Sequence, residues 1–413
     1  MNLSSKKHIP LVALVDDFSP YSIELYQNIK DFKLKILFYG PKKRPISKLN
    51  INFINLLLRN AKKVWTTWLY PFQIVRQARK DCINILHLQL EFNTFGSPLI
   101  LLLLPIMLLL LKLTKIKIII TLHTVFPRSS FKPPHEIKYF LFFRKNTILA
   151  MIILQLILII FYQLLHTLAD KIIVHSHIFK KLLEYDYKAP ESKITVIDMG
   201  IDFSPLPDVN HEELVKLKNK FHDKKVILFF GALSPRKGLE YLMQAFSQIK
   251  TKYSEYALVI AGAPSPYFKH YTDMLRASVE KMGLHLGKDI FFIGPIKEEQ
   301  APYLFMLSEI IIFPYLVLYG MSSALTRVVK YEKPIIATQI PAFTSMLVDG
   351  RNALLVPPRD VKALKNALCK LMSSESLKKY LSENLVKDLK KYSWKSIAQK
   401  TYRLYVDVLS NKQ

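Results

Sequence analysis

Two α/β domains, each a doubly wound parallel sheet with helices on both faces, are the fold that this sequence predicts. The first observation is the length of 413 residues, because single hydrophobic cores stop growing at roughly 250 to 300 residues. The second is a series of short apolar runs that end in glycine, proline or a small polar residue, with helical patterns between them. This alternation is typical of strand–helix–strand units, whose ligands bind at the carboxyl ends of the strands.

The apolar runs place the individual strands. Residues 226–230, for example, are apolar throughout, which fits a parallel strand covered on both faces. We expect strands at residues 11–15, 85–91, 117–121, 171–175, 226–230, 257–262, 289–294, 310–314 and 334–338. His175 and His177 would alternate on one strand and point to opposite faces, which argues against a shared metal ion. No cluster of His, Asp and Glu with ligand spacing appears elsewhere in the sequence.

The most informative segment runs from Val226 to Glu240. Gly231 permits a tight exit from the strand, and two adjacent cations, Arg236 and Lys237, follow where a helix begins. Helix N-terminal amides and two fixed cations together favour a diphosphate group. For these residues taken alone, a solvated basic turn is the alternative.

Composition and charge narrow the function classes. Cys82 and Cys369 lie far apart without metal or redox spacing, and the N-terminus lacks the apolar core of a secretory signal, so we expect a cytoplasmic protein. The formal net charge of +27 attracts polyanions: nucleic acid, anionic lipid or phosphorylated substrates. The lysines are scattered, without zinc spacing or an RNA-binding motif, which argues against nucleic acid. Lysine-rich surface usage for solubility is the other source of the charge.

Two long apolar segments, residues 98–111 and 148–165, stand in the N-terminal half. A helix that is apolar on all sides is either deeply buried or in contact with lipid. A single crossing by residues 148–165 would leave the strands at 117–121 and 171–175 on opposite sides of a bilayer. We therefore expect helices that are partly core and partly an in-plane apolar surface that docks on an anionic membrane, with basic residues around it, at Lys112, Lys115, Arg144 and Lys145. Ordinary buried helices are the alternative.

Several segments, in order and spacing, resemble the retaining nucleotide-sugar glycosyltransferases of family 4. The residues that carry the resemblance are Gly231 to Gly238, Ala261-Gly262, Gly294-Pro295, Phe313-Pro314, Lys333 to Thr338, Val348 to Pro357 and Tyr392 to Trp394. The resemblance covers most of the chain. It implies the GT-B architecture, two Rossmann-like domains that face each other across a cleft.

The resemblance also implies roles for individual residues. Arg236 and Lys237 would stabilise the departing diphosphate, and His123, which follows an expected strand, would face the donor sugar. Further donor contacts are expected from loop residues, at Gly231, Ser234, Pro295, Tyr319, Ser322, Ser323, Ala324, Leu325 and Arg327. No metal and no cofactor are expected, because protein cations would stabilise the leaving group and the nucleotide sugar is itself a substrate.

The sequence departs from the family pattern at two glutamates, whose places are filled by Tyr319 and Arg327. Neither side chain accepts hydrogen bonds as a carboxylate does. The segment from Tyr319 to Leu325 is similar to a variant family loop in which small residues, here Ser322 to Ala324, bring backbone amides to the phosphates. The first loop, Asp16 to Ser22, lacks the paired glycines often found there.

These observations predict a transferase of three parts. Residues 1–200 would form the acceptor domain and residues 201–390 the donor domain, and a last helix in 391–413 would cross back onto the first domain. A hexose would pass from a nucleotide diphosphate sugar to a glycan or lipid-linked acceptor at the inner face of the cell membrane, with retained anomeric configuration. A catalytically silent sugar-nucleotide-binding partner and a basic RNA-binding protein are the alternatives.

Overall fold

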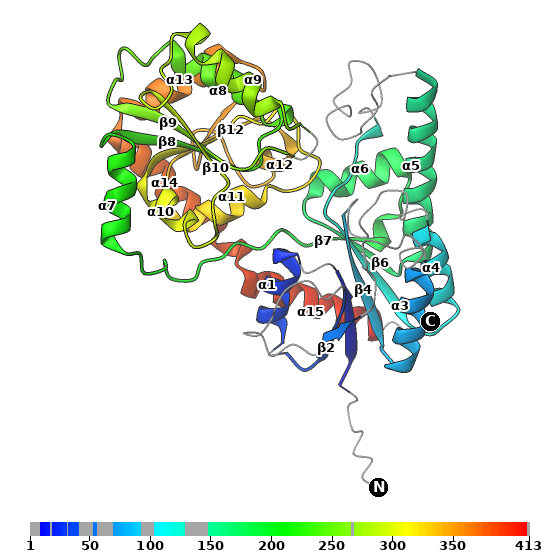
Figure 1. The fold of residues 1–413 in the computed structure, drawn as a ribbon. Helices are drawn as coiled ribbons and strands as arrows, with labels where there is room; N and C mark the ends of the chain where they lie inside the picture. The colour runs from blue at the N-terminus through cyan, green and yellow to red at the C-terminus, as the bar shows by residue number, and fades with distance from the viewer. Residues whose placement is uncertain are drawn as a thin grey trace. The chain divides into compact units, whose positions relative to one another are not determined.

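The computed structural model describes residues 9–16, 19–30, 32–40, 53–55, 69–91, 103–128, 148–265 and 268–410. The chain divides into two compact units (Figure 1). Among the described residues, unit 1 contains the N-terminal part up to Gly200 together with residues 394–410, and unit 2 contains residues 201–393.

Unit 1 is built on a parallel seven-stranded sheet with the order β3-β2-β1-β4-β5-β6-β7. The strands are β1 (Leu11–Val15), β2 (Lys35–Gly40), β3 (Phe53–Asn55), β4 (Ile85–Leu90), β5 (Lys117–Leu122), β6 (Lys171–Val174) and β7 (Ile194–Val196). Every residue of β4 is buried, as expected for a central parallel strand with helices on both faces. The carboxyl ends of β4, β5 and β6 therefore meet at one edge of the sheet.

The helices of unit 1 are α1 (Pro20–Ile29), α3 (Tyr70–Lys80), α4 (Leu104–Lys112), α5 (Ile148–Leu168), α6 (His177–Tyr187), the short 3-10 helix η4 (Glu191–Lys193) and α15 (Trp394–Ser410). Helices α1 and α15 pack together, and they share a hydrophobic core with β1, β2, β4, β5 and β6. Helix α4 packs between α3 and α5.

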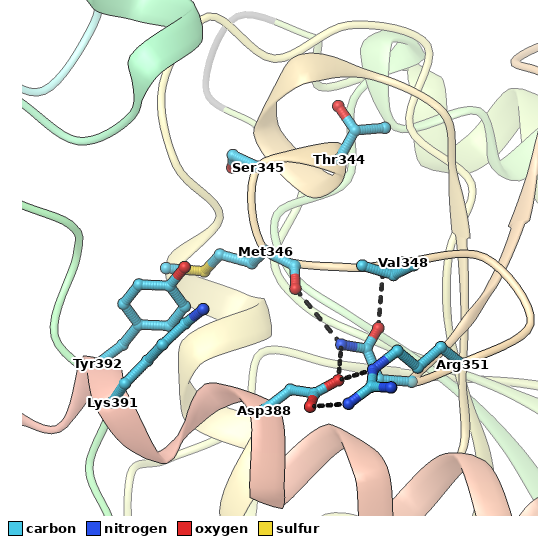
Figure 2. Close-up of a pocket in the computed structure, with 9 residues that line it drawn as sticks. Thr344, Ser345, Met346, Val348, Arg351, Asp388, Lys391 and Tyr392 are labelled. Atoms are coloured by element: carbon cyan, nitrogen blue, oxygen red, sulfur yellow. Dashed lines mark hydrogen bonds and ion pairs between the residues drawn. The ribbon is translucent and has the colours of Figure 1, made fainter.

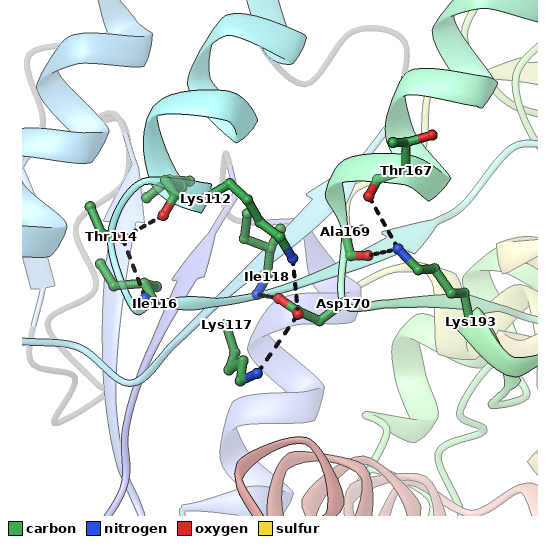
Figure 3. A network of polar contacts seen from close by, with 10 residues as sticks. Lys112, Thr114, Ile116, Lys117, Ile118, Thr167, Ala169, Asp170 and Lys193 are labelled. Carbon is green, nitrogen blue, oxygen red and sulfur yellow. Dashed lines mark hydrogen bonds and ion pairs between the residues drawn. The ribbon is translucent and has the colours of Figure 1, made fainter. Parts of the chain in front are cut away.

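A network of lysines and one carboxylate fixes the ends of α4 and α5 (Figure 3). Lys112 Nζ lies 3.2 Å from Asp170 Oδ1, and Asp170 Oδ2 accepts a 2.7 Å hydrogen bond from Ile118 N, at the start of β5. Lys193 Nζ donates to the carbonyls of Thr167 and Ala169 at 3.1 and 2.8 Å. Lysines suit this position because helix C-termini carry unpaired carbonyls and a partial negative charge.

Unit 2 is built on a parallel six-stranded sheet with the order β10-β9-β8-β11-β12-β13. Its strands are β8 (Lys225–Phe230), β9 (Tyr256–Ala261), β10 (Ile290–Gly294), β11 (Ser308–Phe313), β12 (Ile335–Thr338) and β13 (Leu354–Val356). The central pair, β8 and β11, lies where the strand order reverses. Such a switch point is the usual ligand crevice of a doubly wound sheet.

The α-helices of unit 2 are α7 (His211–Lys220), α8 (Leu239–Ser247), α9 (Tyr271–Ser278), α10 (Ala301–Leu307), α11 (Ser323–Val328), α12 (Pro341–Thr344), α13 (Val361–Met372) and α14 (Glu375–Leu389). The 3-10 helices are η5 (Pro235–Lys237), η6 (Glu280–Met282), η7 (Val329–Tyr331) and η8 (Lys390–Tyr392). Asp360 caps α13 and Ser374 caps α14, each by accepting a backbone N–H hydrogen bond, the usual way of satisfying helix N-terminal donors.

The predicted fold class is confirmed, and one detail of the sequence interpretation is wrong. His175 and His177 do not alternate along a strand, because β6 ends at Val174 and His177 is the first residue of α6, with Ser176 as its N-cap. Ser176 favours the start of a helix there, because its side-chain oxygen accepts a hydrogen bond from Phe179 N. Strands β2, β3, β7 and β13 were also not singled out from the sequence.

Candidate functional site

The loop that follows β8 is shaped by close backbone packing. Gly238 has a φ of +64°, and a Cβ atom there would lie 2.1 Å from the carbonyl oxygen of Pro314. A Cβ atom on Gly262 would lie 1.9 Å from the carbonyl oxygen of Gly231. Only glycine fits these positions, and the loop carrying Lys237 is therefore held directly against the ends of β9 and β11.

Lys237 is a buried cation without a carboxylate partner in the part of the chain that the structure describes. Its side chain is 8% exposed, and its Nζ lies 3.4 Å from the centroid of the Tyr315 ring. Burial, and then the neighbouring Arg236 cation, hold the pKa of Lys237 well below its usual value. Burying an unpaired charge is costly, although a cation over an aromatic face recovers part of that cost. An anion bound at this point would relieve the rest.

Two neighbouring groups support an anion site. Arg236 is partly buried, and burial lowers the pKa of its guanidinium. Ser234 Oγ is buried and makes no hydrogen bond to any described residue. Buried polar atoms are nearly always hydrogen-bonded, so this hydroxyl has an unused capacity to bind a ligand. Both residues lie at the carboxyl end of β8, with Lys237.

The loop after β11 contributes the second set of predicted donor residues. Ser322 is the N-cap of α11, and its Oγ accepts a hydrogen bond from the amide of Leu325. The Leu325 amide is thus already used within the protein, whereas Ser323 is exposed and Ala324 is partly buried. Tyr319, in the same loop, is buried.

Arg327 has an acidic partner. Its Nη2 lies 2.5 Å from Glu298 Oε2, and its guanidinium lies 5.1 Å from the centroid of the Phe230 ring. Glu298 belongs to the segment after Pro295, which is exposed beyond the end of β10. The structure therefore links Arg327, in α11, to the loop that follows Pro295, through a glutamate that the sequence analysis did not single out.

In unit 1, His123 lies beyond the end of β5 and takes part in a chain of hydrogen bonds. Its Nε2 is 2.9 Å from Gln89 Oε1, and its Nδ1 is 3.0 Å from His175 Nε2. His175 Nδ1 is in turn 2.8 Å from the carbonyl oxygen of Ile197. Tyr21 packs edge-on against His123, with 4.7 Å between ring centroids.

The chain continues away from His123 into the core. His87 Nε2 is 3.2 Å from Gln89 Nε2 and 2.7 Å from Thr121 Oγ1, and His87 Nδ1 is 2.6 Å from Tyr405 Oη. Burial lowers the pKa of His87 to about 3 and also lowers the pKa values of His123 and His175. Sequence reasoning placed residues 85–91 on a strand but did not link His87 or Gln89 to His123. The signal was present, since His87 and Gln89 interrupt an otherwise apolar strand.

Residues of the motif from Val348 to Asn352 line a pocket in unit 2 (Figure 2). Arg351 makes a bidentate pair with Asp388, at 2.8 and 2.7 Å, and Asn352 Nδ2 donates to the same carboxylate at 3.1 Å. Asn352 Oδ1 accepts from Val348 N at 2.7 Å. The pocket is lined by Thr344, Ser345, Met346, Val348, Arg351, Asn352, Asp388, Lys391 and Tyr392. The polar side chains of this motif thus tie the turn before β13 to α14.

Two absences apply to the described residues. No group of three or more His, Cys, Asp and Glu side chains that could hold a metal ion was found among them. Nor does any helix within the described ranges have the length and hydropathy that a membrane span requires. Arg144, Lys145 and the start of the first apolar segment, residues 98–102, lie outside these ranges.

Two family models match the chain. The model described as glycosyl transferases group 1 matches residues 210–388, and the model described as glycosyltransferase family 4 matches residues 27–204. The chain belongs to the family 4, group 1 glycosyltransferases. The resemblance to family 4 that was inferred from the sequence is confirmed.

Individual relatives are distant. A D-inositol 3-phosphate glycosyltransferase of Nocardioides sp. is 22% identical over 246 residues, covering 57% of this chain and 53% of the relative. A lipopolysaccharide 1,2-N-acetylglucosaminetransferase of Salmonella typhimurium is 22% identical over 231 residues, covering 56% and 60%. The chain thus spans between half and two thirds of the length of these curated relatives.

Solved structures share the whole fold. The crystal structure of Anabaena Alr3699/HepE in complex with UDP and glucose matches with a TM-score of 0.71 at 14% identity, covering 97% of this chain and all of that one. The predicted GT-B architecture is therefore confirmed. At this identity the likeness establishes the fold alone.

Proposed function

We propose that the protein is a glycosyltransferase that moves a hexose from a nucleotide diphosphate sugar to a glycan or lipid-linked acceptor, with retention of configuration. The observation that carries the donor half is the buried ammonium of Lys237, which has only an aromatic ring as partner among the described residues. Family membership supplies the reaction class. The buried, unpaired charge supplies the reason to expect a diphosphate at the end of β8.

The proposed chemistry at this site is stabilisation of a leaving group. As the bond between the sugar and the diphosphate breaks, negative charge grows on the departing oxygen. Lys237 and Arg236 are fixed before the reaction starts, so no reorganisation is needed when this charge appears. Ser234 Oγ would donate a hydrogen bond to a phosphate oxygen, and the amides of Ser323 and Ala324 are further candidate donors. We expect activity to persist in EDTA, because protein cations would perform this task.

A direct test uses purified protein with a panel of nucleotide sugars. A ligand that binds only the folded state raises the unfolding free energy by about 2.7 kcal/mol at a hundred times its dissociation constant, so thermal shift identifies the donor. Release of the nucleotide, with and without acceptors, then measures turnover. Binding without hydrolysis or transfer would support the silent-partner alternative, which the replaced glutamates at Tyr319 and Arg327 motivate.

The acceptor half of the proposal rests on an exposed apolar face formed by α4 and α5. Helix α5 is apolar on both sides: Leu158, Phe161 and Leu165 are buried, whereas the opposite side faces solvent. At about 100° per residue, the exposed side chains of α5 occupy an arc of about 140°. We call the exposed set the apolar face; it consists of Ile106, Leu109, Leu113, Ile152, Ile153, Leu156, Ile157, Ile160 and Leu164.

We propose that this apolar face lies on an anionic membrane, at the inner surface of the cell membrane. Three of its side chains, Ile152, Leu156 and Ile160, are 48, 53 and 55% exposed, which is unusual for a solvent-facing helix side. Lys112 and Lys115 are exposed at the end of α4. An apolar strip with a basic rim is the chemistry of in-plane binding to anionic lipid.

The same helix holds the segment that follows His123. Tyr162, on the buried side of α5, donates its hydroxyl to the carbonyl of Thr124 and accepts from the amide of Phe126, both at 3.3 Å. Tyr187 of α6 donates to the carbonyl of Phe126 at 2.6 Å. A lipid surface against the exposed side of α5 would thus lie close to the segment that follows His123, which favours a lipid-linked acceptor.

Vesicle flotation tests the membrane proposal. Wild-type protein should float with vesicles containing anionic phosphatidylglycerol and release partly in high salt, because screening removes the electrostatic share. The triple variant Ile152→Ser, Leu156→Ser, Ile160→Ser should stay at the bottom and lose transfer to a lipid-linked acceptor more than to a short soluble one.

A matched control removes three exposed apolar side chains of unit 2, in the triple variant Leu206→Ser, Met274→Ser, Leu286→Ser. It should float like the wild type. Equal flotation of both triple variants would refute the proposed face. A wild-type dimer that the α5 substitutions convert to a monomer would instead assign the face to a second copy of the chain.

A further inference from the structure

The hydrogen-bond chain through His123 determines how many protons His123 and His175 carry. The carbonyl oxygen of Ile197 can only accept, so His175 Nδ1, 2.8 Å away, must carry a proton. A neutral His175 then has a bare Nε2, which accepts from His123 Nδ1 at 3.0 Å. A neutral His123 is thereby left with a bare Nε2, which needs a donor.

The partner of His123 Nε2 is the side-chain amide of Gln89, placed with its oxygen 2.9 Å away. Amide oxygens only accept, so this orientation requires a proton on both nitrogens of one ring. The histidine pair then holds three protons and one positive charge. With the amide turned by about 180°, its nitrogen donates to His123 Nε2 and both rings are neutral. The two orientations exchange the amide oxygen and nitrogen at the same positions, and the number of protons on His123 and His175 distinguishes them.

The turned orientation also satisfies the inner half of the chain. Gln89 Oε1 and Thr121 Oγ1 then accept from His87 Nε2, and His87 Nδ1 accepts from the hydroxyl of Tyr405 at 2.6 Å. Every donor from Tyr405 to the carbonyl of Ile197 now points the same way. Each side chain from Tyr405 to His175 in this hydrogen-bond chain then has a partner, and no buried charge is required.

The surroundings favour the neutral state. Tyr21 packs against both rings of the pair, at 4.7 and 5.2 Å between centroids, and burial raises its pKa, so it brings no charge. Tyr405 is likewise neutral, because burial raises its pKa. Asp198 is the nearby acid and favours proton uptake by His175, but Lys400 Nζ lies 3.1 Å from its carboxylate and offsets that attraction.

We propose that Gln89 is a positioning residue: its amide N–H holds His123 as the neutral Nδ1–H tautomer, and the amide turns over when the His123–His175 pair takes up one proton. In the neutral state, His123 gives one hydrogen bond and receives one, so its ring is fixed in place. Neither nitrogen is then available as an acid or base. Any contribution of His123 to transfer would come from a held, uncharged ring.

Nitrogen NMR of histidine-labelled full-length protein tests this, because imidazole ¹⁵N shifts separate the two neutral tautomers from the imidazolium. Signals are assigned by single histidine substitutions. At pH 7, wild-type His123 and His175 should both show the neutral Nδ1–H pattern, and on acidification they should gain one proton jointly. A neutral Nε2–H tautomer or an imidazolium for His123 at pH 7 would overturn the proposal.

Two substitutions of similar size separate charge from volume. In Gln89→Glu, a carboxylate that only accepts faces His123 Nε2, so the imidazolium pattern should appear at pH 7. In Gln89→Met, which has neither charge nor donor, the neutral Nδ1–H pattern should persist, because His175 still sets it. Identical spectra for wild type and Gln89→Glu, in folded proteins, would refute the role of Gln89.

The kinetic arm of the experiment rests on the proposed function. If His123 serves transfer as a neutral ring, the acidic limb of the kcat profile should move to higher pH in Gln89→Glu and stay in place in Gln89→Met. If the acidic limb stays in place in Gln89→Glu while the NMR signals of His123 change, His123 has no role in the reaction. The proposed hydrogen-bond chain would still stand. The two failures are therefore distinguishable.

Discussion

The two units place polar groups at the carboxyl ends of their strands in opposite ways. In unit 1, His87, His123 and His175 are linked into a continuous hydrogen-bond chain that ends on a backbone carbonyl. In unit 2, Lys237 is buried against Tyr315 with no carboxylate partner among the described residues, and Ser234 Oγ has no hydrogen bond within them. The first arrangement is internally complete, and the second lacks a counter-ion.

This difference shows what each region is built to do. A satisfied buried network adds rigidity and holds side chains in place. An unpaired buried cation costs stability and persists where binding repays that cost. We therefore infer that unit 2 is prepared for an anion, and unit 1 for holding a ring in position. The predictions below test this contrast, from the largest expected effect to the smallest.

Lys237→Met should have the largest effect on activity. Removing one fixed charge that acts on a developing leaving group typically costs about a hundredfold to a thousandfold in kcat. The same change removes an unpaired buried charge, so the unfolding free energy without ligand should rise or stay level. Steady-state kinetics and chemical denaturation of the same preparation measure both quantities.

Lys297→Met is the control, because Lys297 is an exposed lysine in the loop after β10. It should leave both quantities near the wild-type values. Activity of Lys237→Met within threefold of wild type would exclude the diphosphate role. A large loss of stability in that variant would show that the ammonium is stabilised by the protein itself, and the contrast between the units would fail.

Gly238→Ala separates the position of the cations from their charge. The residue has a φ of +64°, and its new Cβ would meet the carbonyl oxygen of Pro314 at 2.1 Å. The left-handed conformation costs roughly 1–2 kcal/mol for a non-glycine residue, and the clash adds to this cost. We expect a lower melting temperature and a loss of turnover although both cations remain. Unchanged turnover would show that the loop position is unimportant.

The predictability of these features from sequence differed between the units. The strand, glycine and cation pattern from Val226 to Gly238 is local in the sequence, so the loop after β8 could be placed in advance. The histidine chain is not local: His87, Gln89 and Tyr405 come from β4 and α15, more than 300 residues apart. Which buried polar groups meet across a sheet depends on register and helix packing, and one sequence does not determine these.

Arg327 illustrates a second limit. The family pattern marked its position as unusual, but it could not supply the partner. Glu298 comes from the loop after β10, and the pair forms because α11 and that loop both lie at the same end of the unit 2 sheet. The apolar segments show a third limit. Their composition allowed burial or lipid contact, and only the side-chain exposure of α5 separates its two faces.

The pH dependence of stability should differ between the units. Burial lowers the pKa of His87 to about 3, below its ordinary value of 6.5, so at mildly acidic pH the unfolded chain binds more protons than the folded one. Stability of unit 1 is therefore complete above about pH 6.5 and declines as the pH falls, by up to about 1.4 kcal/mol per pH unit for each such histidine. His123 and His175 act in the same direction.

Lys237 affects the pH dependence of stability in a different pH range. Because its pKa is lowered, the folded state loses this proton at a lower pH than the unfolded state does. The destabilisation caused by burying the charge therefore decreases as the pH rises towards 10.5. The stability difference between wild type and Lys237→Met should therefore narrow from pH 7 to pH 10. Calorimetry over both ranges checks these signs. An acid-insensitive unit 1 would contradict the neutral histidine chain.

Glu298→Gln should have the smallest effect, and it tests whether Arg327 belongs to the donor site. Glu298 is highly exposed, so its pair with Arg327 contributes at most about 1 kcal/mol to stability. If Arg327 faces the donor, freeing it should tighten binding of a nucleotide diphosphate by up to about fivefold at low salt. The gain should vanish at 1 M salt, where charges are screened within about 3 Å. Titration calorimetry at both salt concentrations measures this. Equal affinities of wild type and Glu298→Gln at low salt would place Arg327 outside the donor site.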